Sequence, residues 1–276
     1  MTINNCYIGL RGHDIGADFG DMLKNADTFN VRNIQLAMTR TLTEYNFYEI
    51  GYDFEVAKKI KKALDDKGVN ISVLSCYINP VERDEKVLER DLVLFENFIR
   101  YAKVFDAGVV GTETGFYKSM EVTRSEENYQ FFLKNIRRLV KKAEKNNVVI
   151  GIEPVDLFTI HSPETMARLL SDVNSDNLAV ILDLSNIITV ENYECQHKIL
   201  DSAFELLGDK IRVIHLKDFK IIDGKKKYTI AGTGDYDIEY LFSWIAKIGI
   251  KPDIILDETS LEHHEESVEN IIKRIE

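Results

Sequence analysis

Four side chains able to bind a metal ion stand at the ends of four successive apolar runs in the second half of the chain. Glu153 ends the run VVIGIE, Asp183 ends LAVILD, His215 lies near the end of RVIHLK, and Glu258 ends DIILDE. Three carboxylates brought together away from water repel one another unless a cation neutralises them. Oxygen ligands with one imidazole suit a hard divalent ion, and Mn²⁺ or Mg²⁺ fits this set better than a structural zinc does.

These residues can act together only if the fold brings them together, and the chain has a regular pattern of elements that would do so. Eight short runs, rich in β-branched residues, alternate with amphipathic segments: Cys6–Leu10, Asn33–Ala37, Ile71–Tyr77, Gly108–Glu113, Val148–Glu153, Leu178–Asp183, Arg212–Lys217 and Asp253–Glu258. Continuous apolar runs are typical of parallel strands buried on both faces. Apolar residues three and four apart, as in Phe95–Phe105, predict helices between the strands.

Eight strand–helix units in 276 residues favour a closed (β/α)8 TIM barrel, forming one domain over residues 1–276. An open dinucleotide-binding sheet is disfavoured because no GxGxxG motif follows the first strand. The carboxyl ends of barrel strands all meet at one face, so the four candidate ligands should converge there. A single acidic residue at a strand end is more often a helix cap or an ion-pair partner. Four residues able to bind a metal, at the ends of four successive strands, indicate a shared site.

Two local patterns predict where helices begin. Ser162, followed by Pro163 and Glu164, has the composition of an N-cap and an acidic first turn. Thr123, three residues before Glu126, predicts a capping box at the start of a long helix. Asp223-Gly224 followed by three lysines predicts a solvated hairpin tip rather than a phosphate site.

The composition excludes several classes of protein. A formal net charge of −11 disfavours binding to nucleic acid. The three cysteines form no CxxC pair, which favours a reducing compartment and gives no support to a disulfide framework. The first residues show no basic start followed by an apolar run, and no apolar stretch approaches the ~20 residues that span a bilayer. We therefore expect a cytoplasmic protein without a membrane partner.

The order of short motifs GIEP, LDLSN, IHLKD, GTGDYD and ILDE resembles the xylose isomerase-like superfamily over nearly the whole chain. That group includes sugar and sugar-phosphate isomerases and epimerases, inosose dehydratases, hydroxypyruvate isomerases and apurinic endonucleases. The resemblance implies that Glu153, Asp183, His215 and Glu258 are the ligands of one divalent ion, with manganese favoured and magnesium, cobalt or zinc also compatible. It also implies that Glu153 and Glu258 serve as an acid/base pair.

The resemblance implies isomerisation or epimerisation of a small sugar, keto-sugar or sugar phosphate. One glutamate removes a proton beside a carbonyl, the other returns it, and the ion stabilises the enediolate between the two steps. The sequence departs from the family where a DxxH motif is expected, because Asn186 stands in place of the histidine. Asn186 can bond a substrate hydroxyl but cannot titrate near neutral pH.

Further polar residues near strand ends are candidates for contact with the substrate. We expect Asn186, Lys217, Asp218 and Glu113 to take this role, although a structural ion pair explains Lys217 and Asp218 equally well. Weaker candidates follow or lie in the first three strands: Arg11, His13, Gln35, Tyr77 and Asn79.

Three other functions remain open from the sequence. A lyase of the inosose dehydratase type would use the same chemistry and eliminate a hydroxyl group. Cleavage of DNA is disfavoured by the acidic charge and the six histidines, too few for a three-metal cluster. A sugar-binding barrel with a degenerate site is kept open by Asn186. Exposed outer helices are compatible with a homo-oligomer.

Overall fold

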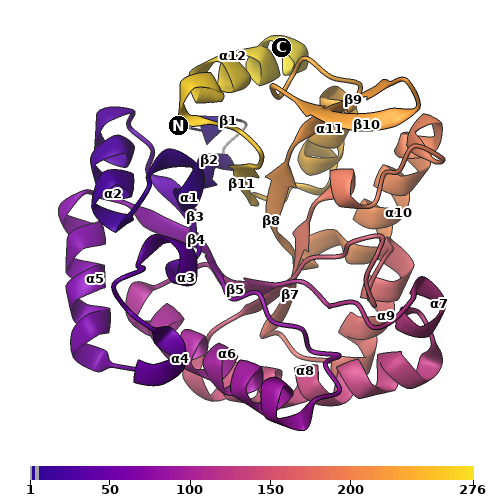
Figure 1. Cartoon of the computed structure of the whole chain (residues 1–276). Coiled ribbons are helices and arrows are strands. Elements are labelled where there is room, and N and C mark those ends of the chain that lie inside the picture. The colour runs from indigo at the N-terminus through magenta and orange to yellow at the C-terminus, as the bar shows by residue number, and fades with distance from the viewer. Residues whose placement is uncertain (1, 4–5) are drawn as a thin grey trace.

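Eight parallel strands close into a barrel in the computed structural model, which describes residues 2–3 and 6–276 (Figure 1). The barrel strands are β2 (Cys6–Arg11), β3 (Asn33–Leu36), β4 (Asn70–Ser75), β5 (Val109–Thr112), β6 (Ile150–Ile152), β7 (Leu178–Leu182), β8 (Ile211–Leu216) and β11 (Asp253–Leu256). Each strand pairs with the next in this order, and β11 pairs with β2 to complete the ring. The predicted (β/α)8 fold is confirmed.

A helix follows each barrel strand and covers the outside of the barrel (Figure 1). These helices are α2 (Phe19–Thr28), α5 (Phe54–Asp66), α6 (Glu85–Phe105), α8 (Glu126–Asn146), α9 (Pro163–Val173), α10 (Gln196–Leu207), α11 (Ile238–Ile248) and α12 (His264–Ile275). Short helical turns lie in the connections: α1 (Gly12–Ile15), α3 (Met38–Thr41), α4 (Phe47–Ile50), α7 (Met120–Thr123), η1 (Leu184–Asn186), η2 (Tyr193–Cys195), η3 (Gly208–Lys210) and η4 (Leu261–His263). None of the helices in the described part of the chain has the length and apolar character needed to cross a bilayer.

The barrel interior and the layer between strands and helices are two separate apolar clusters. The interior cluster consists of one residue from each of five strands: Val73, Val109, Ile181, Val213 and Ile255. Neighbours such as Val180, Ile214 and Ile254 belong instead to the larger cluster under the helices. Because side chains alternate across a strand, a residue two positions after an interior residue also points into the barrel.

One of the two predicted helix starts is confirmed and the other is wrong. Ser162 is the N-cap of α9, where its side chain and that of Thr165 form a reciprocal capping box. Thr123 is instead the last residue of α7, and Ser125 caps α8. The Thr123 hydroxyl is already engaged with the backbone N–H and C=O of Tyr117, so it is not available to the helix that follows.

Two short elements add to the barrel. Strand β1 (Thr2–Ile3) pairs antiparallel with β2. Strands β9 (Asp218–Ile222) and β10 (Lys225–Thr229) form a hairpin between β8 and α11. Its turn residues Asp223 and Gly224 both have positive φ, as a tight two-residue hairpin turn requires. The predicted hairpin is confirmed, but its middle lysine is only partly exposed. Lys226 Nζ donates to the backbone oxygens of Ser185 and Ile188, the latter at 2.7 Å.

Candidate metal and substrate site

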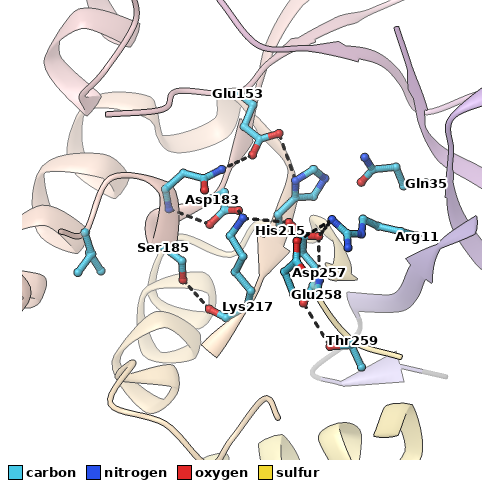
Figure 2. Close-up of polar contacts among 12 residues, drawn as sticks. Arg11, Gln35, Glu153, Asp183, Ser185, His215, Lys217, Asp257, Glu258 and Thr259 are labelled. Atoms are coloured by element: carbon cyan, nitrogen blue, oxygen red, sulfur yellow. Dashed lines mark hydrogen bonds and ion pairs between the residues drawn. The ribbon is translucent and has the colours of Figure 1, made fainter. Parts of the chain in front are cut away.

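Three of the four predicted ligands lie together at the carboxyl ends of three adjacent strands (Figure 2). Glu153 follows β6, Asp183 follows β7 and His215 lies near the end of β8; their exposed fractions are 4%, 0% and 4%. One ligand atom from each lies within 4.8 Å of the others. Asp183 and His215 each stand two positions after an interior residue, Ile181 and Val213, so strand alternation points both side chains into the barrel.

The atoms of this cluster fit a divalent metal ion. His215 Nε2 is buried and makes no hydrogen bond within the described residues, whereas the buried Asp183 Oδ2 contacts the Lys217 ammonium at 3.0 Å. Buried polar atoms without partners are rare in proteins and indicate a missing ligand or ion. Two carboxylates and one imidazole match the donor preferences of Mn²⁺, Mg²⁺ or Zn²⁺. Glu153, Asp183 and His215 are therefore the residues that could hold the ion.

The titration behaviour of the cluster reflects crowded negative charge. Burial, opposed by Lys217 and supported by the negative charge of Glu153, raises the pKa of Asp183 to about 6. Burial lowers the pKa of His215, but the Glu153 carboxylate outweighs this effect, so the pKa of His215 is raised overall. Glu153 Oε2 lies 3.3 Å from His215 Nδ1. A bound cation would directly relieve the repulsion between the Glu153 and Asp183 carboxylates.

A buried lysine already supplies one positive charge. Lys217 Nζ lies 3.0 Å from Asp183 Oδ2 and 3.1 Å from Asp257 Oδ2 (Figure 2). Asp257 Oδ1 also contacts Arg11 Nη1 at 2.5 Å. Burial would raise the pKa of Asp257, but Lys217 and Arg11 outweigh it and lower that pKa. Asp257 is thus a buried, ionised carboxylate at the edge of the cluster.

Glu258, the fourth predicted ligand, lies outside the three-residue cluster. Its side chain is 47% exposed, and Oε1 lies 3.2 Å from Arg11 Nη1. Ile255 belongs to the barrel interior, so alternation along β11 turns Asp257 inward and Glu258 away. Glu258 also has a φ of 53°, in the left-handed region, which marks the point where the strand ends. Its role as a ligand stays a prediction.

The cluster opens into a cavity of about 440 Å³. Its lining combines the cluster with residues from strand ends all around the barrel: Arg11, His13, Arg40, Tyr77, Glu113, Glu153, Val155, Phe158, Asn186, His215, Lys217, Asp257 and Glu258. The volume lies at the low end of the range for small-molecule sites. The cavity is therefore large enough for one small, polar molecule.

A comparison with models of protein families identifies the family to which the chain belongs. The family model described as xylose isomerase-like TIM barrel matches residues 23–275. The chain belongs to the xylose isomerase-like TIM barrel family. Among curated proteins, no sequence match is found.

Solved structures of this family share the fold at low sequence identity. A D-tagatose 3-epimerase-like protein has a TM-score of 0.77 at 16% identity, with 98% of each chain covered. A xylose isomerase-like TIM barrel protein from Mycobacterium smegmatis in complex with magnesium has a TM-score of 0.70 at 15% identity, with 98% of each chain covered. The IOLI protein with a zinc atom has a TM-score of 0.73 at 16% identity, with 97% of this chain and 96% of that chain covered.

Asn186, where the family pattern has histidine, holds a carboxylate of the cluster in this xylose isomerase-like barrel. Its Nδ2 donates to Glu153 Oε1 at 2.7 Å, and its backbone N–H donates to Asp183 Oδ1 at 3.2 Å. Asn186 lines the cavity, as expected for a residue that contacts substrate. The hydrogen bond from Asn186 also fixes the orientation of the Glu153 carboxylate.

Three of the four predicted substrate-contacting residues line the cavity, namely Glu113, Asn186 and Lys217. Burial, followed by the negative charge of Glu153, raises the pKa of Glu113 to about 7. A carboxyl group with this pKa is partly protonated at neutral pH, so it can donate as well as accept a hydrogen bond.

The structure does not bring Asp218 to the cavity. Asp218 is fully buried, and its carboxylate accepts four backbone N–H groups of β9 and the loop before α11: those of Phe219, Gly232, Gly234 and Tyr236. Asp218 is an odd number of positions away from His215 and Lys217 along the extended chain, so its side chain points to the other face, toward the loop.

Among the weaker candidates, Arg11, His13 and Tyr77 line the cavity. Gln35 lies behind Tyr77 and donates to its hydroxyl at 2.8 Å, and Asn79 contacts the backbone of Phe116.

Four lining residues were not identified from the sequence: the charged Asp257 and Arg40, and the apolar Val155 and Phe158. Asp257 stands two positions after Ile255, and alternation along the strand places both side chains on the same face. This alternation was the signal in the sequence that could have identified Asp257. Arg40 lies in the short helix α3 after β3, and no sequence pattern distinguishes it from other surface arginines.

Proposed function

We propose that this barrel is a divalent-metal-dependent isomerase or epimerase of a small sugar, keto-sugar or sugar phosphate. The observation that carries the proposal is the buried cluster of Glu153, Asp183 and His215, of which Glu153 and His215 line a cavity of about 440 Å³ and His215 Nε2 has no hydrogen-bond partner among the described residues. The family and the sugar epimerases among its structural neighbours support the same class of reaction. The cytoplasmic location predicted from the cysteine pattern stays part of this proposal.

Glu153, Asp183 and His215 would hold the ion, with manganese favoured by the oxygen-rich donor set. We propose Asp257 as the fourth ligand in place of Glu258, because strand alternation turns it toward the other three. When bound, a divalent ion supplies Lewis-acid polarisation of substrate oxygens.

The protein's own residues would move the proton. Glu153 is held by Asn186 at 2.7 Å, and Glu258 is held by Arg11 at 3.2 Å; both line the cavity. We assign the removal and return of the proton to this pair, as predicted from the sequence. Lys217, fixed between two aspartates, places a permanent positive charge beside the carbonyl oxygen on which negative charge develops.

The test combines metal content with proton exchange. Protein purified without chelator should contain about one divalent ion per chain, and His215→Ala should lose it, whereas the exposed control His263→Ala should keep it. Glu153→Gln should abolish the exchange of a substrate C–H proton with deuterated solvent, measured by NMR over a panel of ketoses and ketose phosphates. Product mass separates isomerisation from dehydration. No metal in the wild type, and no thermal shift on adding Mn²⁺, would overturn the proposal.

A further inference from the structure

The wall of the cavity that faces the metal cluster carries positive charge. In the ring of eight strands, β3 lies directly opposite β7, which bears Asp183. Arg40 follows β3 in α3, and His13 follows β2 in α1; both line the cavity. A molecule that reaches the metal cluster at one end therefore meets Arg40 and His13 at the other.

Arg40 differs from the other two cations of the lining because no acidic residue pairs with it. Arg11 contacts Asp14, Asp257 and Glu258, and Lys217 contacts Asp183 and Asp257. Within residues 2–3 and 6–276, the only side-chain contacts recorded for Arg40 are with the His13 ring, at 3.3 Å between Nη1 and Nε2, and with the ring of Tyr77, at 6.0 Å from the centroid. Its guanidinium is left facing the cavity without an anion.

His13 adds a second unsatisfied group on the same wall. Its Nδ1 is buried and has no hydrogen-bond partner in the described chain. Asp14 Oδ1 lies 3.9 Å from the other ring nitrogen, too far for a hydrogen bond. An unpaired guanidinium beside an unsatisfied imidazole is an arrangement that a planar carboxylate or a phosphate can complete with several charge-assisted hydrogen bonds.

We propose that Arg40 and His13 form a subsite for an anionic group of the substrate, so that the substrate is a phosphorylated or carboxylated sugar rather than a neutral one. This inference rests on the proposed function and names its substrate class. The anion sits against β2 and β3, and the reacting carbonyl sits across the cavity at Glu153, Asp183 and His215. In a protein with a net charge of −11, this local positive potential also draws an anionic substrate to the site.

Binding of inorganic phosphate and of D-glucuronate to the purified full-length protein tests the subsite directly by calorimetry. Arg40→Gln should weaken binding of the preferred anion by about tenfold to a hundredfold, the usual range for losing a hydrogen bond to a charged group. Arg40→Lys should retain part of the affinity because it keeps the charge. The matched control Arg212→Gln removes an exposed arginine near the start of β8, at the opposite end of the barrel, and should change affinity less than twofold.

The tighter of the two anions identifies phosphate or carboxylate as the group recognised. Binding of neither anion, or equal affinity in Arg40→Gln and wild type, would overturn the subsite. Proton exchange on D-fructose, compared with D-fructose 6-phosphate if phosphate binds more tightly or with D-glucuronate if carboxylate does, then separates the two proposals. Equal exchange on the neutral and the anionic sugar overturns the subsite and leaves the isomerase intact. Arg40-dependent anion binding without exchange on any ketose or sugar acid leaves the subsite and overturns the isomerase.

Discussion

Lys217 and Asp257 give the candidate site a fixed ion pair before any metal binds. The Lys217 ammonium contacts Asp183 and Asp257, and Arg11 contacts Asp257 from the other side. Lys217, Asp183 and Asp257 thus each have a partner of opposite sign, which is the condition under which buried ions are tolerated. Lys217 also holds Asp183 in place, so the ligand cluster is organised in advance by a side chain that does not itself bind the ion.

The fourth ligand can be identified by comparing two neighbouring carboxylates. If Asp257 completes the metal site, Asp257→Asn should weaken metal binding by about 10–100-fold, the size of effect seen when groups around a metal site are changed. Glu258→Gln should leave metal affinity within a few-fold while lowering turnover, because its partly exposed side chain lies outside the cluster. Calorimetric titration of both variants with Mn²⁺ checks this. Metal loss in Glu258→Gln with retention in Asp257→Asn would restore the original prediction from the sequence.

Glu113 makes the stability of the metal-free protein depend on pH. Its pKa is about 7 in the folded protein, raised from 4.5, so folding takes up a proton between these values. Stability should therefore fall as pH rises from 4.5 to 7 and change no further above 7. Glu113→Gln removes this dependence and should be more stable than wild type at pH 8 by roughly 2 kcal/mol. Urea unfolding at pH 5 and pH 8, after dialysis against a chelator, measures the difference. The same difference at both pH values would contradict the prediction.

The sequence identified Glu153, Asp183 and His215 because each ends an apolar run, and strand ends converge in a barrel. The fourth ligand was predicted to be Glu258, and its equally acidic neighbour Asp257 was not identified from the sequence. That choice depends on which residue shares the inward parity of Ile255 and on where the strand ends, and both are set by pairing with β2 and β8. The same parity explains Asp218, which follows Lys217 in the sequence and points the opposite way.

At the scale of elements, Asp218 acts as an anchor for the loop between the hairpin and α11. Its carboxylate oxygens accept the N–H of Gly234 at 2.7 Å, of Gly232 at 3.0 Å and of Tyr236 at 3.1 Å. The GTGDYD segment thus wraps around one buried acidic side chain. Gly234 is needed because the backbone there approaches that side chain too closely for a Cβ atom.

Gly234→Ala tests this anchor. An added Cβ would lie 2.1 Å from Asp218 Oδ1 and 2.4 Å from the backbone oxygen of Phe219, so the loop must move. We expect the free energy of unfolding to fall by about 2 kcal/mol or more, the range for breaking a buried hydrogen-bond network. The control Gly20→Ala lies in α2, where the nearest atom is the Asp18 side chain at 3.3 Å, and should be close to neutral. Denaturant unfolding of both variants provides the comparison, and equal stability would show that the loop adapts without cost.

Helix starts show how far local patterns reach. Ser162 was predicted correctly because its cap, its proline and its partner Thr165 all lie within four residues. Thr123 failed because its hydroxyl bonds the backbone of Tyr117, six residues earlier, in a loop that the pattern does not describe. A pattern within one helical turn was sufficient to predict the cap at Ser162. At Thr123 a residue outside the turn engages the hydroxyl, and the local pattern gives no sign of this.

At the scale of the whole molecule, the metal cluster joins three adjacent strands, β6, β7 and β8. An ion that binds only the folded barrel stabilises it by about 2.7 kcal/mol at a concentration 100 times its Kd. For a chain of this size, that corresponds to a rise in Tm of about 5–10 °C. Thermal unfolding with and without Mn²⁺ measures the rise, and Asp183→Asn should abolish it. A rise of the same size in that variant would place the ion elsewhere.

The hairpin of β9 and β10 lies beside the cluster but is no part of a barrel strand. The strand ends of the barrel carry the cluster, while the hairpin is an insertion fastened to the loop after β7 by Lys226, with the Tyr228 ring 5.2 Å from the Lys217 ammonium. All barrel strands lie outside the hairpin, so it can be exchanged if its first residue, Asp218, is kept as the anchor of the loop before α11. For protein engineering, the hairpin is thus an exchangeable module. Its length and its tyrosine can be redesigned to admit larger or differently shaped molecules, while Glu153, Asp183 and His215 stay untouched.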